Sequence, residues 1–177
     1  MANRKRARAT SPKKELLRKI VLEAAARLFA ERGFGGTNLQ DLADELNISR
    51  PALYYYFKSK EDILASLIEE VTMFSVHQAT QIANRSQSNP TEALRSMVIC
   101  HSKWLLDHRI QFRVIDRTES NLPKTVQNSH DLAKRQLLDN FRRTIERGIS
   151  LGHFRPVDPT VAAFSIIGMC SWTAWWF

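Results

Sequence analysis

The 177-residue chain carries a formal net charge of +8, and 44% of its residues are hydrophobic, enough for a folded core. Cys100 and Cys170 show neither metal-site spacing nor a disulfide framework, which favours a reducing compartment. No apolar stretch reaches the roughly 18 residues that a membrane-spanning helix needs. We therefore expect a cytoplasmic protein with no signal peptide and no membrane partner.

The positive charge lies mainly in the first third of the chain. Residues 1–60 hold 13 Lys/Arg against 6 Asp/Glu, whereas residues 61–177 hold 13 against 12. This asymmetry favours an N-terminal part that meets a polyanion, although a solvated basic surface would give the same count. Residues 1–10 lack apolar periodicity and contain Arg4, Lys5, Arg6 and Arg8. They predict a disordered basic arm that can enter a DNA minor groove.

Ser11 and Pro12 are suited to begin a first helix, and the glycines of "RGFGG" to end it. Two adjacent rows of residues at i+4 spacing predict one apolar face along this helix. The rows consist of Leu16, Ile20, Ala24 and Leu28, and of Leu17, Val21, Ala25 and Phe29.

Two short helices are predicted next, joined by a four-residue turn at 46–49. Thr37 and Gln40 have the spacing of a capping box for the first of them, and its inward positions include Leu39 and Leu42. Asn47 tolerates positive φ within the turn. Ser49 can cap the second short helix, which has Pro51 in its first turn. This arrangement predicts a helix-turn-helix, although a generic αα-hairpin has a similar pattern.

The second short helix contains three consecutive tyrosines, which a step of 100° per residue separates by direction. With Leu53 and Phe57 inward, Pro51 and Tyr55 point outward. Ala52 and Tyr54 then flank that outward side, and Tyr56 tilts partly back towards the core. Exposed aromatic residues suit a major groove better than solvent, because they can contact thymine methyls and phosphates.

Several polar residues extend this predicted DNA-binding surface. Arg50 can reach a guanine edge and Gln40 an adenine edge or a phosphate, whereas Thr37, Ser49 and Lys60 lie at helix N-termini that favour phosphate. The predicted DNA-binding residues are Thr37, Gln40, Ser49, Arg50, Pro51, Ala52, Tyr54, Tyr55, Tyr56 and Lys60.

The rest of the chain also reads as helical. A fourth helix begins at Ser59 and Asp62, a fifth is capped by Thr91, and a short apolar piece covers 110–115. A long helix is predicted over about 125–150, and a last helix begins at 158–159 and still runs at Phe177. No strand alternation is visible, so we predict an all-α fold. Its predicted parts are the arm (1–10), the helix-turn-helix domain (11–60) and a second helical domain (61–177).

Catalysis finds little support in the sequence. Tyr56 and Lys60 have the spacing of a short-chain dehydrogenase pair, but the nucleotide-binding βαβ unit that such enzymes need is missing. His101 and His108 lack a metal-ligand pattern. We therefore expect no enzyme, no cofactor and no metal site. A non-specific architectural DNA-binding protein is the alternative, although it would not explain the neutral, aromatic-rich second half.

The stretch "LFAERGFGGTNLQDLADELNISRPALYYYFKSKEDIL" resembles the DNA-binding domain of TetR-family transcriptional repressors, over about Leu28 to Leu67. Asn47 replaces a glycine that is usual in the turn, and Pro51 replaces a small residue. The resemblance implies a homodimer that places its third helices in successive major grooves of a palindromic operator, and a C-terminal domain for ligand binding and dimerisation.

The last helix suits the implied subunit interface, because small residues alternate with Phe, Met and Trp. An intramolecular core face would show the same pattern. The predicted interface residues are Phe164, Ser165, Gly168, Trp172 and Trp175. The chain stops abruptly after "WTAWWF", so we expect a further helix beyond Phe177.

The sequence gives fewer indications of the implied ligand site than of the DNA-binding surface. The segment "RPVDPTVAAFSIIGMCSWTAWWF" is similar to the ending of TetR-type regulators that sense acyl-CoA thioesters in lipid and steroid breakdown. Arginines can clamp the phosphates of such an effector, although plain core aromatics and solvated arginines are the alternative. The candidate ligand residues are Trp104, Phe112, Arg113, Arg117, Phe141, Arg147 and Trp172.

Overall fold

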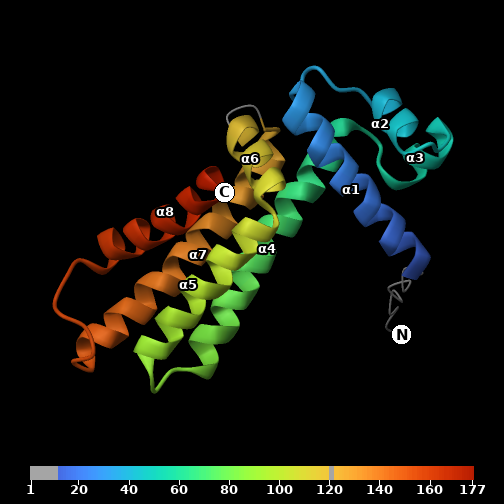
Figure 1. The fold of residues 1–177 in the computed structure, drawn as a ribbon. Coiled ribbons are helices and arrows are strands. Elements are labelled where there is room, and N and C mark those ends of the chain that lie inside the picture. Colours follow the sequence, from blue (N-terminus) through green and yellow to red (C-terminus); the bar gives the residue numbers. More distant parts are fainter. Residues whose placement is uncertain (1–11, 120–121) are drawn as a thin grey trace. The chain divides into compact units, whose positions relative to one another are not determined.

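The computed structural model describes residues 12–119 and 122–177, which form eight α-helices and no strand (Figure 1). The predicted all-α fold is confirmed. The chain divides into two compact units, Met1–Ile63 and Leu64–Phe177. The predicted basic arm and the cap at Ser11 lie outside the described residues.

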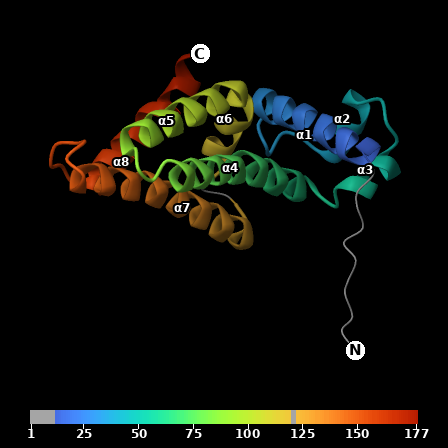
Figure 2. The same cartoon turned by 90° about the horizontal axis from the view of Figure 1, so that it is seen from below.

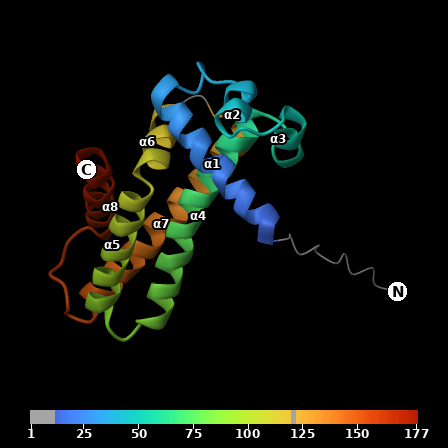
Figure 3. The same ribbon diagram turned by 45° about the vertical axis from the view of Figure 1, so that its right-hand side comes forward.

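The first unit contains α1 (Pro12–Arg32), α2 (Leu39–Glu45) and α3 (Arg50–Tyr56), with α2 in contact with both of the others (Figure 3). Burial along α1 begins at Val21. Leu16 and Ile20 are 61% and 40% exposed, so the N-terminal part of the predicted apolar face is not covered. An apolar row defines a face of a helix, but it does not show how far along the helix that face is covered.

The cap of α2 differs from the predicted Thr37–Gln40 box by one residue. Asn38 is the N-cap, and its Oδ1 accepts from the backbone N–H groups of Gln40 (2.8 Å) and Asp41 (3.0 Å). In turn, the Asp41 carboxylate accepts a hydrogen bond from the Asn38 N–H at 2.8 Å. Thr37 is buried instead, and its hydroxyl lies within hydrogen-bonding distance of the carbonyls of Gly33 (3.0 Å) and Leu28 (3.4 Å). The Thr37 hydroxyl therefore bonds to carbonyls at the C-terminal end of α1 and does not cap α2.

The turn between α2 and α3 has the predicted form. Asn47 adopts φ 51°, and the Ile48 N–H donates to the Ala43 carbonyl at 3.0 Å. Ser49 is the N-cap of α3 and accepts from the Ala52 N–H at 3.3 Å, with Pro51 in the first turn. Local residue chemistry therefore defines where α3 begins.

The second unit is a bundle of long helices (Figure 2). It contains most of α4 (Lys60–Arg85), together with α5 (Pro90–Asp107), α6 (Arg109–Thr118), α7 (Lys124–Ser150) and α8 (Pro159–Trp176). Asn89, not the predicted Thr91, caps α5, because its side chain accepts from the Glu92 N–H. Asp158 caps α8 as predicted, accepting from the N–H groups of Thr160 and Val161.

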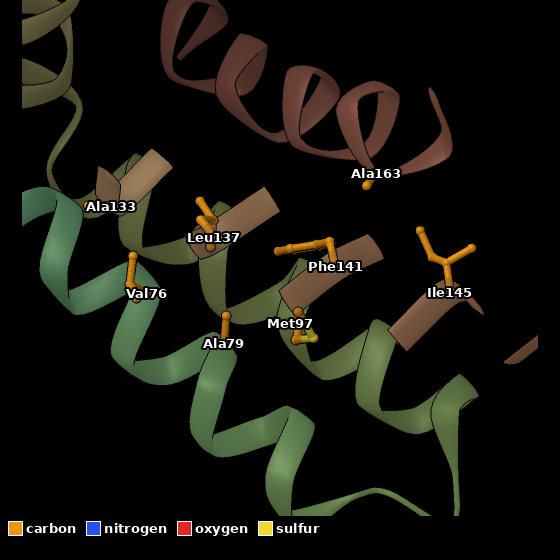
Figure 4. Packing of buried hydrophobic residues seen from close by; sticks show 8 residues of the cluster. All are labelled: Val76, Ala79, Met97, Ala133, Leu137, Phe141, Ile145 and Ala163. Carbon is orange, nitrogen blue, oxygen red and sulfur yellow. The ribbon is translucent and has the colours of Figure 1, made fainter. Parts of the chain in front are cut away.

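The core of this bundle lies where α4, α5, α7 and α8 meet. Figure 4 shows the side chains of Phe141 and Leu137 from α7 directed into the same space as Met97 from α5 and Val76 from α4. Phe141 has no exposed surface. The same four helices, together with α6, also line a cavity in the second unit.

Candidate nucleic-acid interface and ligand cavity

The outward face of α3 has the aromatic character that the sequence predicts. Tyr55 is 69% exposed and Tyr54 43% exposed, whereas Leu53 has no exposed surface. Arg50 and Pro51 are exposed, and Ala52 and Tyr56 are half-buried. The buried Leu53 and Phe57 hold the helix, so the aromatic residues on its other side are free to contact a partner.

Cationic side chains accompany the tyrosines of α3. The Arg50 Nη2 donates to the Tyr54 hydroxyl at 3.3 Å, and its guanidinium lies 5.6 Å from the centre of that ring. The Lys14 ammonium of α1 lies 4.7 Å from the centre of the Tyr55 ring, which in turn meets Tyr56 edge to face. Positive charge at an exposed aromatic surface is suited to a phosphate backbone.

Other predicted DNA-binding residues are already engaged within the unit. Lys60 donates to the carbonyls of Phe34 (2.9 Å) and Thr37 (3.2 Å), and Gln40 donates to Asp44 at 2.7 Å. The hydroxyl of Ser49 accepts the capping bond. The first role of these side chains is to shape the unit, and Thr37 is too buried to reach DNA with its side chain.

A second candidate site is a cavity of about 230 Å³ within the second unit, which we call the inner cavity. Residues from all five helices of that unit line it, and most of the lining surface is apolar. Its polar lining residues are Thr72, Ser75, His101, Asp116, Glu119, His130, Lys134 and Ser171. A wider groove of about 530 Å³ between α4 and α7 shares Thr72 and His130 with it.

His101 is a deeply buried polar side chain that lines the cavity, at 7% exposure. Its Nδ1 lies 3.3 Å from the Ser75 hydroxyl, and its Nε2 has no hydrogen-bond partner among the described residues. Burial lowers the pKa of His101 from 6.5 to about 4, because a charged imidazole would lose its hydration. His101 is therefore neutral at pH 7.

His130 approaches the cavity from α7. Its Nδ1 lies 3.2 Å from the Thr72 hydroxyl, and its Nε2 lies 4.0 Å from Glu119. Burial lowers the pKa of His130, and the nearby Glu119 carboxylate opposes that shift. Glu119 itself pairs with Lys134 at 2.6 Å. His101 and His130 are not among the ligand residues predicted from the sequence, because each lies among the apolar residues of its helix.

The candidate ligand residues from the sequence are dispersed. Phe112 lines the inner cavity, whereas Phe141 belongs to the core, so its prediction as a lining residue is wrong. Trp104 stacks on Phe74 with ring centres 3.7 Å apart and donates to the Val71 carbonyl. A core aromatic fills space where helices cross, and periodicity alone does not distinguish it from a residue at a cavity.

The predicted arginines do not line the inner cavity either. The Arg113 Nε donates to the Ala174 carbonyl at 2.7 Å, and the guanidinium groups of Arg113 and Arg117 both lie 5.6 Å from the centre of the Trp175 ring. Arg147 is exposed. These arginines join α6 to α8 or face solvent, so the described residues offer no arginine clamp inside the cavity.

The last helix exposes an apolar stripe. Phe164, Met169 and Trp172 are 60%, 64% and 62% exposed, and Ser165 and Gly168 share their surface. A Cβ added at Gly168 would meet no atom of the chain within 4 Å. The predicted interface residue Trp175 is only half-exposed and faces Arg113 and Arg117.

Residues 12–119 and 122–177 contain no group of three or more metal-ligating side chains placed to hold an ion. None of the helices described is both long and apolar enough to cross a bilayer.

Comparison with known proteins gives matches along most of the chain. The model described as "Bacterial regulatory proteins, tetR family" matches residues 21–67, and "Tetracyclin repressor-like, C-terminal domain" matches residues 87–177. The TetR family transcriptional regulator PfmR from Thermus thermophilus is 30% identical, with a TM-score of 0.82 covering 89% of this chain and 85% of that one.

Two further relatives carry informative descriptions. KstR2 of Mycobacterium tuberculosis, an HTH-type transcriptional repressor, is 26% identical over 155 residues, covering 87% of this chain and 77% of that protein. Its structure, that of a ketosteroid transcriptional regulator, superposes with a TM-score of 0.82. AibR in complex with isovaleryl coenzyme A and operator DNA is 29% identical, with a TM-score of 0.75 covering 90% of this chain and 86% of that one.

Some relatives are considerably longer. The chain spans 48% and 36% of the lengths of YerO and YuxN, two uncharacterized HTH-type regulators of Bacillus subtilis. The two family models nevertheless match both units, and the C-terminal model alone matches residues 87–177, more than half of the chain. The chain therefore belongs to the TetR family of bacterial regulatory proteins.

Proposed function

We propose that the chain is a DNA-binding transcriptional repressor that binds a palindromic operator as a homodimer and is released by a small-molecule effector. The observation that carries the DNA-binding part is the outward face of α3, where Tyr54 and Tyr55 are exposed beside Arg50 while Leu53 is fully buried. A helix that hides its aliphatic residues and exposes its aromatic ones is built to insert that exposed face into a partner. The major groove accommodates one helix of this width.

The related proteins support the regulatory role. KstR2 is named a transcriptional repressor, and AibR has been crystallised with both isovaleryl coenzyme A and operator DNA. On this basis we assign the effector to the inner cavity and its class to acyl-CoA thioesters. The cavity is large enough for a short acyl group but not for a whole coenzyme, whose nucleotide would have to lie outside it.

The test of DNA binding is a selection from random duplexes with the purified chain, followed by fluorescence anisotropy on the selected site. A repressor should prefer that site over random DNA by roughly 10³ or more, with half-sites about 34–36 Å apart. The affinity should fall steeply with salt, because Lys and Arg displace condensed counterions. Equal affinity for random and selected duplexes would identify an architectural protein instead.

The test of the effector is thermal stabilisation by short-chain acyl-CoA thioesters compared with free CoA. Binding to the folded state raises the melting temperature in proportion to the logarithm of ligand concentration over Kd. An effector must also lower operator affinity at the same concentrations. If no thioester stabilises the protein more than free CoA does, the acyl-CoA class is wrong, although the DNA-binding proposal stands.

A further inference from the structure

The inner cavity adjoins the wider groove of about 530 Å³ between α4 and α7, which we call the outer groove. Thr72 of α4 and His130 of α7 line both spaces. These two side chains meet between the helices, with the Thr72 hydroxyl 3.2 Å from the His130 Nδ1. The two spaces are therefore neighbours at this contact, so a ligand that is too long for the inner cavity can continue into the outer groove.

The lining of the outer groove combines apolar and neutral polar side chains. Met73 and Leu132 contribute apolar surface and are both exposed, so they are available to a ligand. Thr125, Ser129 and Gln136 contribute hydroxyl and amide groups. A lining of this kind can pack against a carbon chain and form hydrogen bonds with amide groups in that chain.

The same groove is unsuited to phosphates. None of its described lining residues is a lysine or an arginine, and the carboxylate among them is that of Glu69. Burial lowers the pKa of His130, so its imidazole carries little positive charge at pH 7. A phosphate in the outer groove would therefore meet repulsion and find no cationic partner.

The charged residues that line only the inner cavity are no better for a phosphate. Asp116 and Glu119 place two carboxylates there against one ammonium, that of Lys134. Lys134 is already paired with Glu119 at 2.6 Å. Because these three groups together are negative, they oppose the passage of a coenzyme's phosphates. The outer groove is the better path for the uncharged part of a coenzyme.

From these observations we infer that a single thioester occupies both spaces. Its acyl group lies in the inner cavity, its thioester lies beside Thr72 and His130, and its uncharged pantetheine arm lies in the outer groove. The phosphates of the coenzyme remain in solvent, so the protein recognises the acyl group and the arm. The inference rests on the proposed acyl-CoA effector and names the parts of that effector that the protein contacts.

Three thioesters with the isovaleryl group of the AibR complex separate the parts of the ligand. The S-ethyl thioester has no arm, isovaleryl-pantetheine has the arm alone, and isovaleryl-CoA adds the nucleotide. By calorimetry, isovaleryl-pantetheine should bind roughly tenfold more tightly than the S-ethyl thioester, because the arm gains hydrogen bonds and buries apolar surface. Isovaleryl-CoA should bind within about threefold of isovaleryl-pantetheine, and its affinity should change little with salt. An arm that adds no affinity, or a nucleotide that adds most of it, would overturn the inference.

Ser129→Trp tests whether the arm lies in the outer groove. Ser129 is exposed, so the variant should fold while its indole fills part of the groove. Isovaleryl-pantetheine should then bind no more tightly than the S-ethyl thioester, whose own affinity should stay at the wild-type value. Asn128→Trp is the matched control, because Asn128 is exposed on the same helix but does not line the groove, and it should keep the wild-type difference. If Ser129→Trp also keeps that difference, the arm lies elsewhere.

A measurement on the unsubstituted protein covers the case in which Ser129→Trp does not fold. The ¹³C-labelled methyl group of Met73 should change its chemical shift when isovaleryl-pantetheine binds, and much less when the S-ethyl thioester binds. Met169 is exposed on α8 and lines neither space, so its methyl resonance should stay in place. A Met73 resonance that does not respond to the arm would overturn the inference.

The outcomes for the inference and for the proposed function are distinguishable. If the arm contributes to binding but the bound thioester does not lower operator affinity, the proposed release from DNA fails and the inference stands. If thioesters release the operator without any contribution from the arm, the inference alone fails. If no isovaleryl thioester binds, the proposed effector class and the inference fail together.

Discussion

Lys60 and Phe34 tie the first residue of α4 to the loop between α1 and α2. The Lys60 Nζ donates to the Phe34 carbonyl at 2.9 Å and lies 4.6 Å from the centre of the Phe34 ring. The same ammonium bonds to the carbonyl of Thr37, immediately before the cap of α2. Phe34 in turn meets Phe29 of α1 edge to face at 5.1 Å. A residue predicted to contact phosphate therefore joins three elements of the first unit.

We expect Lys60→Met to lower the free energy of unfolding by about 1–2 kcal/mol, because two backbone carbonyls lose a charged donor and the ring loses its cation. Urea denaturation measures this change. Lys58→Met is the matched control, since Lys58 is exposed and its side chain has no such contacts described, and it should be nearly neutral. If Lys60→Met weakened only operator binding and left stability intact, Lys60 would be a phosphate contact after all.

Tyr55→Ala should weaken operator binding and leave the melting temperature nearly unchanged. Tyr55 is 69% exposed and contributes little to the core, but its ring lies on the outward face of α3. Anisotropy titrations and thermal melts on the same samples separate the two effects. Normal operator affinity in Tyr55→Ala would show that this face of α3 does not enter the groove.

Leu53→Ala, on the same helix, should lower the stability of the protein, unlike Tyr55→Ala. Leu53 is fully buried, so its truncation leaves a cavity and should cost about 2–5 kcal/mol of unfolding free energy. Operator binding should then fail together with the cooperative thermal transition. A Leu53→Ala protein with wild-type stability would contradict the assigned inward side of α3.

Gly168→Leu tests the proposed dimer surface on α8. A Cβ at this position meets no atom of its own chain, and leucine favours a helix over glycine, so the subunit itself should fold. If two α8 stripes pack together at Gly168, the larger side chain will separate them. Sedimentation velocity should then show a shift from dimer to monomer, with circular dichroism unchanged. A dimer that persists would place the interface elsewhere.

Stability should fall as pH decreases from about 6.5 to 4. The pKa of His101 is lowered from 6.5 to about 4 in the folded state, so within this window the unfolded chain binds a proton that the folded chain does not. Acid therefore favours unfolding, by about 3 kcal/mol when the window has been crossed. The lowered pKa of His130 acts in the same direction. Chemical denaturation across this range measures the slope.

His101→Gln removes the main titration while keeping a polar side chain, so its stability should vary less with pH than that of the wild type. His153→Gln changes a histidine at an exposed position and should keep the wild-type slope. Parallel slopes for the wild type and His101→Gln would show that His101 titrates alike in the folded and unfolded states.

The helices of this protein and the region proposed to recognise DNA could be predicted from residue types and their spacing. Asn47, Ser49 and Pro51 act through backbone conformations that each residue adopts locally, so the turn and the start of α3 could be predicted from residue chemistry. The burial of Leu53 and the exposure of Tyr55 follow from helical periodicity in the same way. The predicted caps Thr37 and Thr91 lie one and two positions from the observed caps, Asn38 and Asn89. Several neighbouring residues at a helix start can accept the same bonds, so the sequence pattern did not distinguish them.

The contacts of the long side chains and of the polar core residues depend on how the helices pack, so they could not be predicted in this way. Lys60 and Arg113 reach across to distant carbonyls, and their flexibility makes many targets sterically possible, so no sequence pattern selects one. His101 looks like any residue on an apolar helical stripe until Ser75, 26 positions earlier in the chain, is packed beside it. That contact exists because the packing of α4 against α5 brings the two side chains together.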